Sequence, residues 1–209
     1  MTDMGDAFLD QGYREAELSD IPRIVRIHEV AFPGFFMTML GPEFLEGYYR
    51  FVFRYPGKVL LVKEGEGGLE GFVAGFLNPG VFYTNLRARS WRFIGPILLR
   101  ICTHPWLLPR LFASYAQARR SSQEVGAGVC ELSSIAVPPD LGGRGIGKGL
   151  VRAFLSATRG KANLVELTTD AEGNDAVNAF YQSLGFTLVG SYERSKGRRM
   201  NKYRLSVEA

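Results

Sequence analysis

Residues 128–150, GVCELSSIAVPPDLGGRGIGKGL, contain the stretch that decides the fold. The first ten residues predict a strand, which must end at the pair Pro138–Pro139. A glycine-rich loop follows, and the apolar spacing of GLVRAFLSATRG (149–160) predicts a helix directly after it. This order favours an anion-binding site, because converging backbone N–H groups of the loop meet the positive end of the helix dipole.

The segments on either side predict an α/β protein with one mixed sheet. We expect a single domain over 12–207 and a loose tail over 1–11. Period-2 patterns and apolar runs predict strands at 13–18, 58–64, 69–77, 128–137, 163–171, 186–195 and 198–207. Period-3.6 patterns predict helices at 18–32, 42–55, 149–160 and 173–186.

Composition narrows the classes of function. The chain has 209 residues, 46% of them hydrophobic, and a net charge of +4, which suits an anionic ligand but is too small for a typical nucleic-acid-binding protein. Cys102 and Cys130 have apolar neighbours and no metal-ligand spacing, so we expect two buried free thiols. The first ten residues carry acids and no long apolar run, so we expect no signal peptide and a cytoplasmic protein.

Two motifs resemble a known family. IAVPPDLGGRGIGKGLV (135–151) is similar to motif A of the GNAT superfamily of acetyl-CoA-dependent N-acetyltransferases, and NDAVNAFYQSLGF (174–186) resembles its N-x-x-A-x-x-x-Y-x-x-x-G-F segment. The resemblance implies a mostly antiparallel central sheet flanked by helices. Two positions depart from the pattern, since Gly142 replaces a Gln or Arg and Val177 replaces the usual Ala.

The resemblance also implies acetyl-CoA as co-substrate and no metal. Ile135, Ala136 and Val137 would offer backbone groups to the pantetheine arm, and Asn174 would contact the pantetheine side. The diphosphate would lie against the backbone of six consecutive residues, namely Gly143, Arg144, Gly145, Ile146, Gly147 and Lys148. A Walker-type phosphate loop is excluded, because Gly149 stands where that motif needs Ser or Thr after its Lys.

Acetyl transfer to an amine needs a base for the amine proton, a polarised thioester carbonyl and a proton for the leaving thiolate. By resemblance, Tyr181 is the candidate acid for the thiolate. Glu131 is the candidate base, because a carboxylate inside an apolar strand acquires a raised pKa when it is partly buried. A water relay, or Glu166 or Thr168 on the next strand, are the alternatives.

The binding site of the acceptor amine and the region 81–127 lie outside the two motifs. His28, with a pKa suited to base catalysis, and Phe35 and Phe36, in the apolar stretch 31–41, are candidates for acceptor contacts. The region 81–127 mixes aromatic residues, Leu and Ile with Arg at intervals, which predicts a helical insertion acting as a lid or a homodimer contact. Contact with a membrane surface is the less favoured alternative, since no apolar run there could span a bilayer.

The sequence therefore predicts an enzyme that acetylates the primary amine of a small molecule such as an amino sugar or an amino acid. Two alternatives remain open. One is a domain that binds CoA or acyl-CoA without transfer, and the other is acetylation of a protein N-terminus or lysine.

Overall fold

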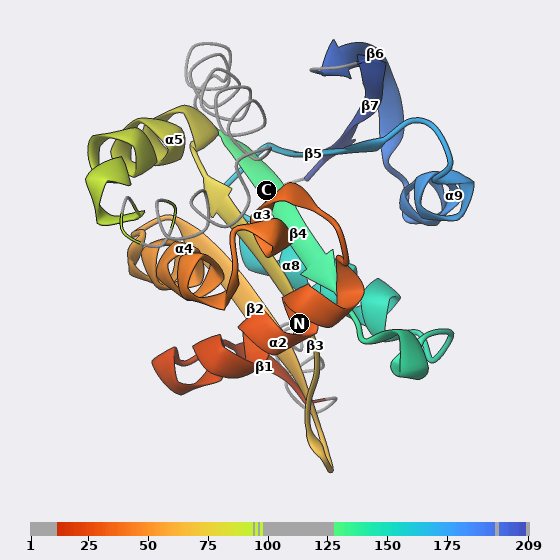
Figure 1. The fold of residues 1–209 in the computed structure, drawn as a ribbon. Helices are drawn as coiled ribbons and strands as arrows, with labels where there is room; N and C mark the ends of the chain where they lie inside the picture. Colours follow the sequence, from red (N-terminus) through yellow and green to blue (C-terminus); the bar gives the residue numbers. More distant parts are fainter. Residues whose placement is uncertain (1–11, 94, 96, 98–127, 195–196, 208–209) are drawn as a thin grey trace.

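A seven-stranded sheet with the order β1-β2-β3-β4-β5-β7-β6 lies at the centre of the protein (Figure 1). The structure, a computed structural model, describes residues 12–93, 95, 97, 128–194 and 197–207. The strands are β1 (Tyr13–Glu15), β2 (Lys58–Gly65), β3 (Gly68–Leu77), β4 (Val129–Ala136), β5 (Leu164–Asp170), β6 (Thr187–Arg194) and β7 (Arg198–Ser206). Among these strands only β4 and β5 pair in parallel, so the expected mixed, mostly antiparallel sheet is confirmed.

Helices cover both faces of the sheet. They are α2 (Ile21–Ala31), α3 (Phe36–Met39), α4 (Pro42–Arg54), α5 (Pro79–Ala88), α8 (Ile146–Thr158) and α9 (Asp175–Ser183), with short 3-10 turns η1 (Leu18–Asp20), η2 (Ser90–Phe93) and η4 (Pro139–Leu141). Apolar residues of α2, α4 and α5 form one core against the sheet, and those of α8 and α9 form a second core on the opposite face. Figure 1 shows α2 and α4 in front of the central strands and α8 behind them.

Helix α8 begins earlier than the sequence predicts, at Ile146 instead of Gly149. Gly145 is its N-cap in the left-handed region, with φ +80°, which a residue without Cβ adopts readily. Gly149 lies inside the helix, and the close packing of β1 favours a residue without Cβ there, because a Cβ would come within 1.8 Å of the Tyr13 hydroxyl. Fold requirements therefore account for part of the glycine content of this loop.

The expected insertion is described only at its start. Helix α5 begins at Pro79, two residues before the predicted boundary of 81–127, and ends at Ala88. Most of the remaining insertion, the predicted tail 1–11 and Cys102 lie outside the described residues. Cys130 is a buried free thiol, as expected. None of the described helices is long and apolar enough to cross a membrane.

Candidate functional site

Strands β4 and β5 pair over a short distance and then separate. Their parallel register runs from Val129↔Leu164 to Glu131↔Glu166, although β4 continues to Ala136 and β5 to Asp170. In Figure 1, β4 runs toward the loop before α8, whereas β5 runs toward α9. Beyond Glu131 the β5-side edge of β4 has no strand partner among the described residues, so its backbone groups are free for a ligand that extends the sheet.

A bulge in β4 lies at the point of separation. On the β3 side, Ala74 pairs with Ser134 and Gly75 with Leu132, which leaves Ser133 as the extra residue. The Ser133 hydroxyl lies 3.2 Å from the Tyr48 hydroxyl of α4. The bulge changes which face the side chains point to, and the predicted residues Ile135, Ala136 and Val137 follow it at the end of the strand.

The N-terminus of α8 lies at the end of this open edge and is uncapped. No side chain caps the helix, and no described residue accepts a hydrogen bond from the N–H of Ile146, Gly147 or Lys148. Gly143 and Gly145 hold the preceding turn at φ +77° and +80°, and a Cβ on either would enter open space. Free N–H groups at the positive end of a 13-residue helix fit a diphosphate.

Helix α9 lies beside the N-terminus of α8. A Cβ on Gly147 would lie 3.6 Å from the Phe180 ring, so the first turn of α8 and the middle of α9 are in contact. Tyr181 is 6% exposed, its ring packs against Phe180 and Phe186, and burial raises the pKa of its hydroxyl far above the ordinary value. The Asn174 amide donates to Thr169 Oγ1 at 2.8 Å and thereby joins the start of α9 to the end of β5.

Glu131 and Glu166 face each other on the last paired rung of β4 and β5. Glu131 Oε1 accepts a hydrogen bond of 2.7 Å from the Tyr83 hydroxyl of α5. Burial and, to a lesser degree, the negative charge of Glu166 raise the pKa of Glu131 to about 7, although Tyr83, Lys202 and Arg194 act against the rise. A carboxylate with a pKa near neutrality is suited to accept a proton.

Glu166 has a different environment from Glu131. It is 5% exposed, and its Oε2 lies 3.0 Å from Lys202 Nζ and 3.3 Å from Arg204 Nε, both on β7. Two cations therefore compensate its buried charge, whereas Glu131 forms no ion pair with a described residue. The geometry favours Glu131 as the proton acceptor over the alternative Glu166.

His28 lies in the core between α2 and α4. It is 4% exposed, and its Nδ1 lies 2.7 Å from the Tyr49 hydroxyl. The ring also packs against Phe32 at 4.8 Å between centroids. Burial lowers the pKa of His28 to about 4, so the imidazole is neutral at pH 7. These contacts indicate a packing role and give no support to the predicted acceptor contact.

His28 should make stability depend on pH. Since its folded pKa of about 4 lies below the unfolded value of 6.5, its contribution is present above pH 6.5 and is lost as the pH falls toward 4. We expect wild type to lose about 3 kcal/mol more free energy of unfolding across this window than His28→Gln, which keeps an acceptor for Tyr49. Urea unfolding at a series of pH values measures the difference, and parallel curves for the two proteins would contradict it.

Phe35 and Phe36 lie between α2 and α4. Phe35 is 44% exposed, packs against Phe32, and has the Arg198 guanidinium 5.6 Å from its ring centroid. Arg198 in turn forms an ion pair with Asp170 at the end of β5. Phe36 is half-buried at the start of α3. The structure thus brings Phe35, but not His28, to the side of the molecule where β5 and β7 meet.

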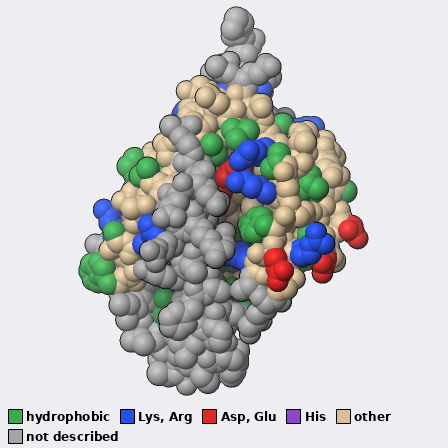
Figure 2. Space-filling model, turned by 90° about the horizontal axis from the view of Figure 1, so that it is seen from above, with side chains coloured by type: hydrophobic (Ala, Val, Ile, Leu, Met, Phe, Trp, Pro, Cys, Tyr) green, Lys and Arg blue, Asp and Glu red, His purple; other side chains and the backbone are tan. Residues whose placement is uncertain are grey.

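The β6–β7 hairpin makes this side basic. Figure 2 shows Lys and Arg side chains grouped beside a hollow in the face seen from above, with fewer acidic side chains around them. The hairpin contributes Arg194, Arg198, Arg199, Lys202 and Arg204. Three of these five cations are already paired, Arg198 with Asp170 and both Lys202 and Arg204 with Glu166, so the hairpin offers less uncompensated positive charge than its composition indicates.

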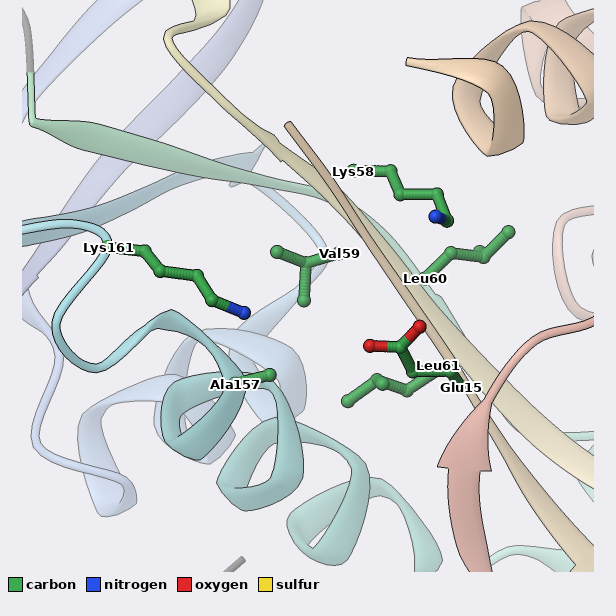
Figure 3. A pocket seen from close by; sticks show the side chains of 7 residues that line it. All are labelled: Glu15, Lys58, Val59, Leu60, Leu61, Ala157 and Lys161. Atoms are coloured by element: carbon green, nitrogen blue, oxygen red, sulfur yellow. The ribbon is translucent and has the colours of Figure 1, made fainter. Parts of the chain in front are cut away.

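A small cavity lies between β2 and the C-terminal end of α8. Glu15, Lys58 and Lys161 line it together with apolar residues of β2, and Lys161 and Glu15 extend into it from different elements (Figure 3). Its volume of about 10 Å³ holds no more than about one water molecule, so it is too small for a substrate or a cofactor. The described residues contain no group of three or more His, Cys, Asp or Glu placed to hold a metal ion.

Comparison with known proteins gives the family. The sequence profile described as the acetyltransferase (GNAT) family matches residues 21–186. The chain belongs to this family. A GNAT relative, the N-alpha-acetyltransferase RimI of Mycobacterium tuberculosis, is 44% identical over 64 residues, which are 31% of this chain and 39% of RimI. The match therefore spans less than half of the length of this curated relative.

Solved GNAT structures share the fold. The ribosomal-protein-S18-alanine N-acetyltransferase of Escherichia coli superposes with a TM-score of 0.58 at 15% identity, covering 94% of each chain. Ard1 of Thermoplasma volcanium superposes with a TM-score of 0.60 at 16% identity, covering 93% of this chain and 96% of its own. Tyr83 is the site residue that the sequence patterns do not reveal, because it lies outside both GNAT motifs and its distance in sequence from Glu131 hides the contact.

Proposed function

We propose that the protein transfers the acetyl group of acetyl-CoA to a primary amine. The observation that carries this proposal is the uncapped N-terminus of α8 beside the unpaired edge of β4. The helix end and the glycine turn suit the diphosphate, and the free strand edge suits the amide groups of pantetheine. Gly143, Gly145 and Gly147 would keep side chains away from the diphosphate, while Arg144 and Lys148 add positive charge.

The reaction requires few groups. The acceptor nitrogen attacks the thioester carbon, the new C–N bond forms, and the C–S bond breaks. Glu131 would take the proton released from nitrogen, since burial brings its pKa to about 7. The N–H of Val137 would polarise the thioester carbonyl, and Tyr181 would give a proton to the departing thiolate.

Removal of the Tyr181 hydroxyl tests the assignment of the acid. Tyr181→Phe should lower kcat about tenfold and leave acetyl-CoA affinity unchanged. The loss is limited because a thiol with a pKa of about 8.5 can also depart as the thiolate, without a proton from an acid. Release of free thiol measures turnover, and calorimetric titration measures affinity. An unchanged kcat would assign Tyr181 to the core alone, in line with its burial.

The acceptor has two candidate classes. A small-molecule amine is our leading candidate, whereas the match to RimI, an N-alpha-acetyltransferase, favours the α-amine of a protein N-terminus. A panel of amino sugars and amino acids should be compared with short peptides that have free or blocked N-termini. Turnover of peptides alone, abolished by the block, would replace the small-molecule assignment.

Binding and transfer are separated by two measurements. Calorimetric titration with acetyl-CoA should show a single site, and thiol release should then depend on the amine. Binding without amine-dependent thiol release over the whole panel would support a CoA-binding domain instead of an enzyme. Absence of binding would remove both assignments.

A further inference from the structure

We infer that Tyr83, which lies in helix α5 and outside the GNAT motifs, is a positioning residue for Glu131. This inference deepens the proposed function and rests on it for its catalytic meaning. The direct observation is the hydrogen bond of 2.7 Å from the Tyr83 hydroxyl to Glu131 Oε1, which joins residues 48 positions apart. Helix α5 lies in neither of the two GNAT motifs, so the contact links the candidate base to a segment at the start of the expected insertion.

The helix that carries Tyr83 is firmly held. The N–H of Asn78, just before α5, donates to the Val129 carbonyl at the start of β4 at 2.9 Å. Within α5, Phe82 anchors the helix directly before Tyr83. Phe82 is fully buried, and its ring stacks on that of Phe76 with centroids 3.6 Å apart. Phe76 is itself the cross-strand partner of Glu131. The donor and the acceptor are therefore fixed to the same rung of the sheet.

Tyr83 engages only one oxygen of the carboxylate. No described residue hydrogen-bonds Oε2 of Glu131, so this oxygen can take up the proton of the substrate amine directly or through a water. The bond selects one orientation of the carboxylate and favours its charged form. Titratable and charged groups on four neighbouring elements also act on Glu131 or on Tyr83. They are Tyr48 of α4, Glu166 of β5, Arg194 of β6 and Lys202 of β7.

The test compares two tyrosines of one aromatic cluster. Tyr83→Phe removes the donor to Glu131, whereas Tyr55→Phe removes a hydroxyl that donates to the Leu77 carbonyl and leaves Glu131 untouched. In Tyr83→Phe, the acidic limb of the plot of kcat against pH should shift to higher pH by about one unit. Turnover should then fall about fivefold at pH 7 and stay unchanged at pH 9. With the second variant, the limb should stay in place.

A carboxylate titration separates this inference from the proposed function. With ¹³C-labelled glutamate, the Glu131 resonance is assigned by its loss in Glu131→Gln, and its pKa is read without turnover. We expect the pKa to be higher in Tyr83→Phe than in wild type and unchanged in Tyr55→Phe. An unmoved pKa, or an activity loss equal at every pH, would overturn the inference. A moved pKa in a protein that acetylates no amine would instead remove the proposed function.

Discussion

Replacing Glu131 by Gln is expected to lower kcat for amine acetylation by about a hundredfold or more, with little change in acetyl-CoA affinity. Gln keeps the shape of the side chain and an oxygen that can accept the Tyr83 hydrogen bond, but it cannot take a proton. Loss of a positioned general base costs about 10² to 10⁴ in rate. Thiol release at saturating substrate measures the effect, and calorimetric titration checks that acetyl-CoA still binds.

Glu166→Gln is the matched control on the same rung of the sheet. Removal of the Glu166 charge should lower the pKa of Glu131, because that charge raises it in wild type, and the acidic limb of the kcat profile should move to lower pH. The loss of kcat should be smaller than in Glu131→Gln, although Lys202 and Arg204 lose their partner. A larger loss in Glu166→Gln, with near-normal turnover in Glu131→Gln, would make Glu166 the base.

Stability provides a second readout for Glu131 that does not depend on activity. Its folded pKa of about 7 lies above the unfolded value of 4.5, so its contribution is present below pH 4.5 and is lost as the pH rises through 7. Glu131→Gln should therefore raise the free energy of unfolding at pH 8 by about 2 kcal/mol, and by much less at pH 4.5. Equal stability of the two proteins at pH 8 would contradict the raised pKa.

Replacing Gly145 by Ala is expected to weaken acetyl-CoA binding by at least about tenfold. The residue caps α8 at φ +80°, and a Cβ there would project into the open space before the free N–H groups of the helix. The left-handed conformation costs an alanine about 1 kcal/mol, and relief of that strain would turn the N–H groups away from the diphosphate. Calorimetric titration measures the affinity.

Gly160→Ala is the control for strain alone. Gly160 has φ +68°, and a Cβ at this residue, as at Gly145, would meet no atom within 4 Å, but Gly160 follows the opposite end of α8. Both variants should lose similar thermal stability, and only Gly145→Ala should lose affinity. If Gly145→Ala binds acetyl-CoA as wild type does, the diphosphate does not lie at this loop.

Local patterns predict most of the fold. The apolar run of β2 and the spacing of buried residues in α4 depend on neighbours in the chain, and both elements lie close to the predicted bounds. The predicted start of α8 is three residues late, because glycine lowers helix propensity and the close approach of Tyr13 to Gly149 is a long-range contact. The bounds of α5 escape prediction for a similar reason, since Phe82 docks on Phe76 only in the folded sheet.

The sequence by itself determined the α/β class, the order of strand, glycine turn and helix, and the family, since these depend on periodicity and on the conformational needs of adjacent residues. Only the tertiary structure decided the surroundings of the chemical groups. Packing buried His28 beside Tyr49, paired Glu166 with two cations, and placed Tyr83 on Glu131. Proton affinity depends on burial and on neighbouring charges, which come together only when distant segments pack.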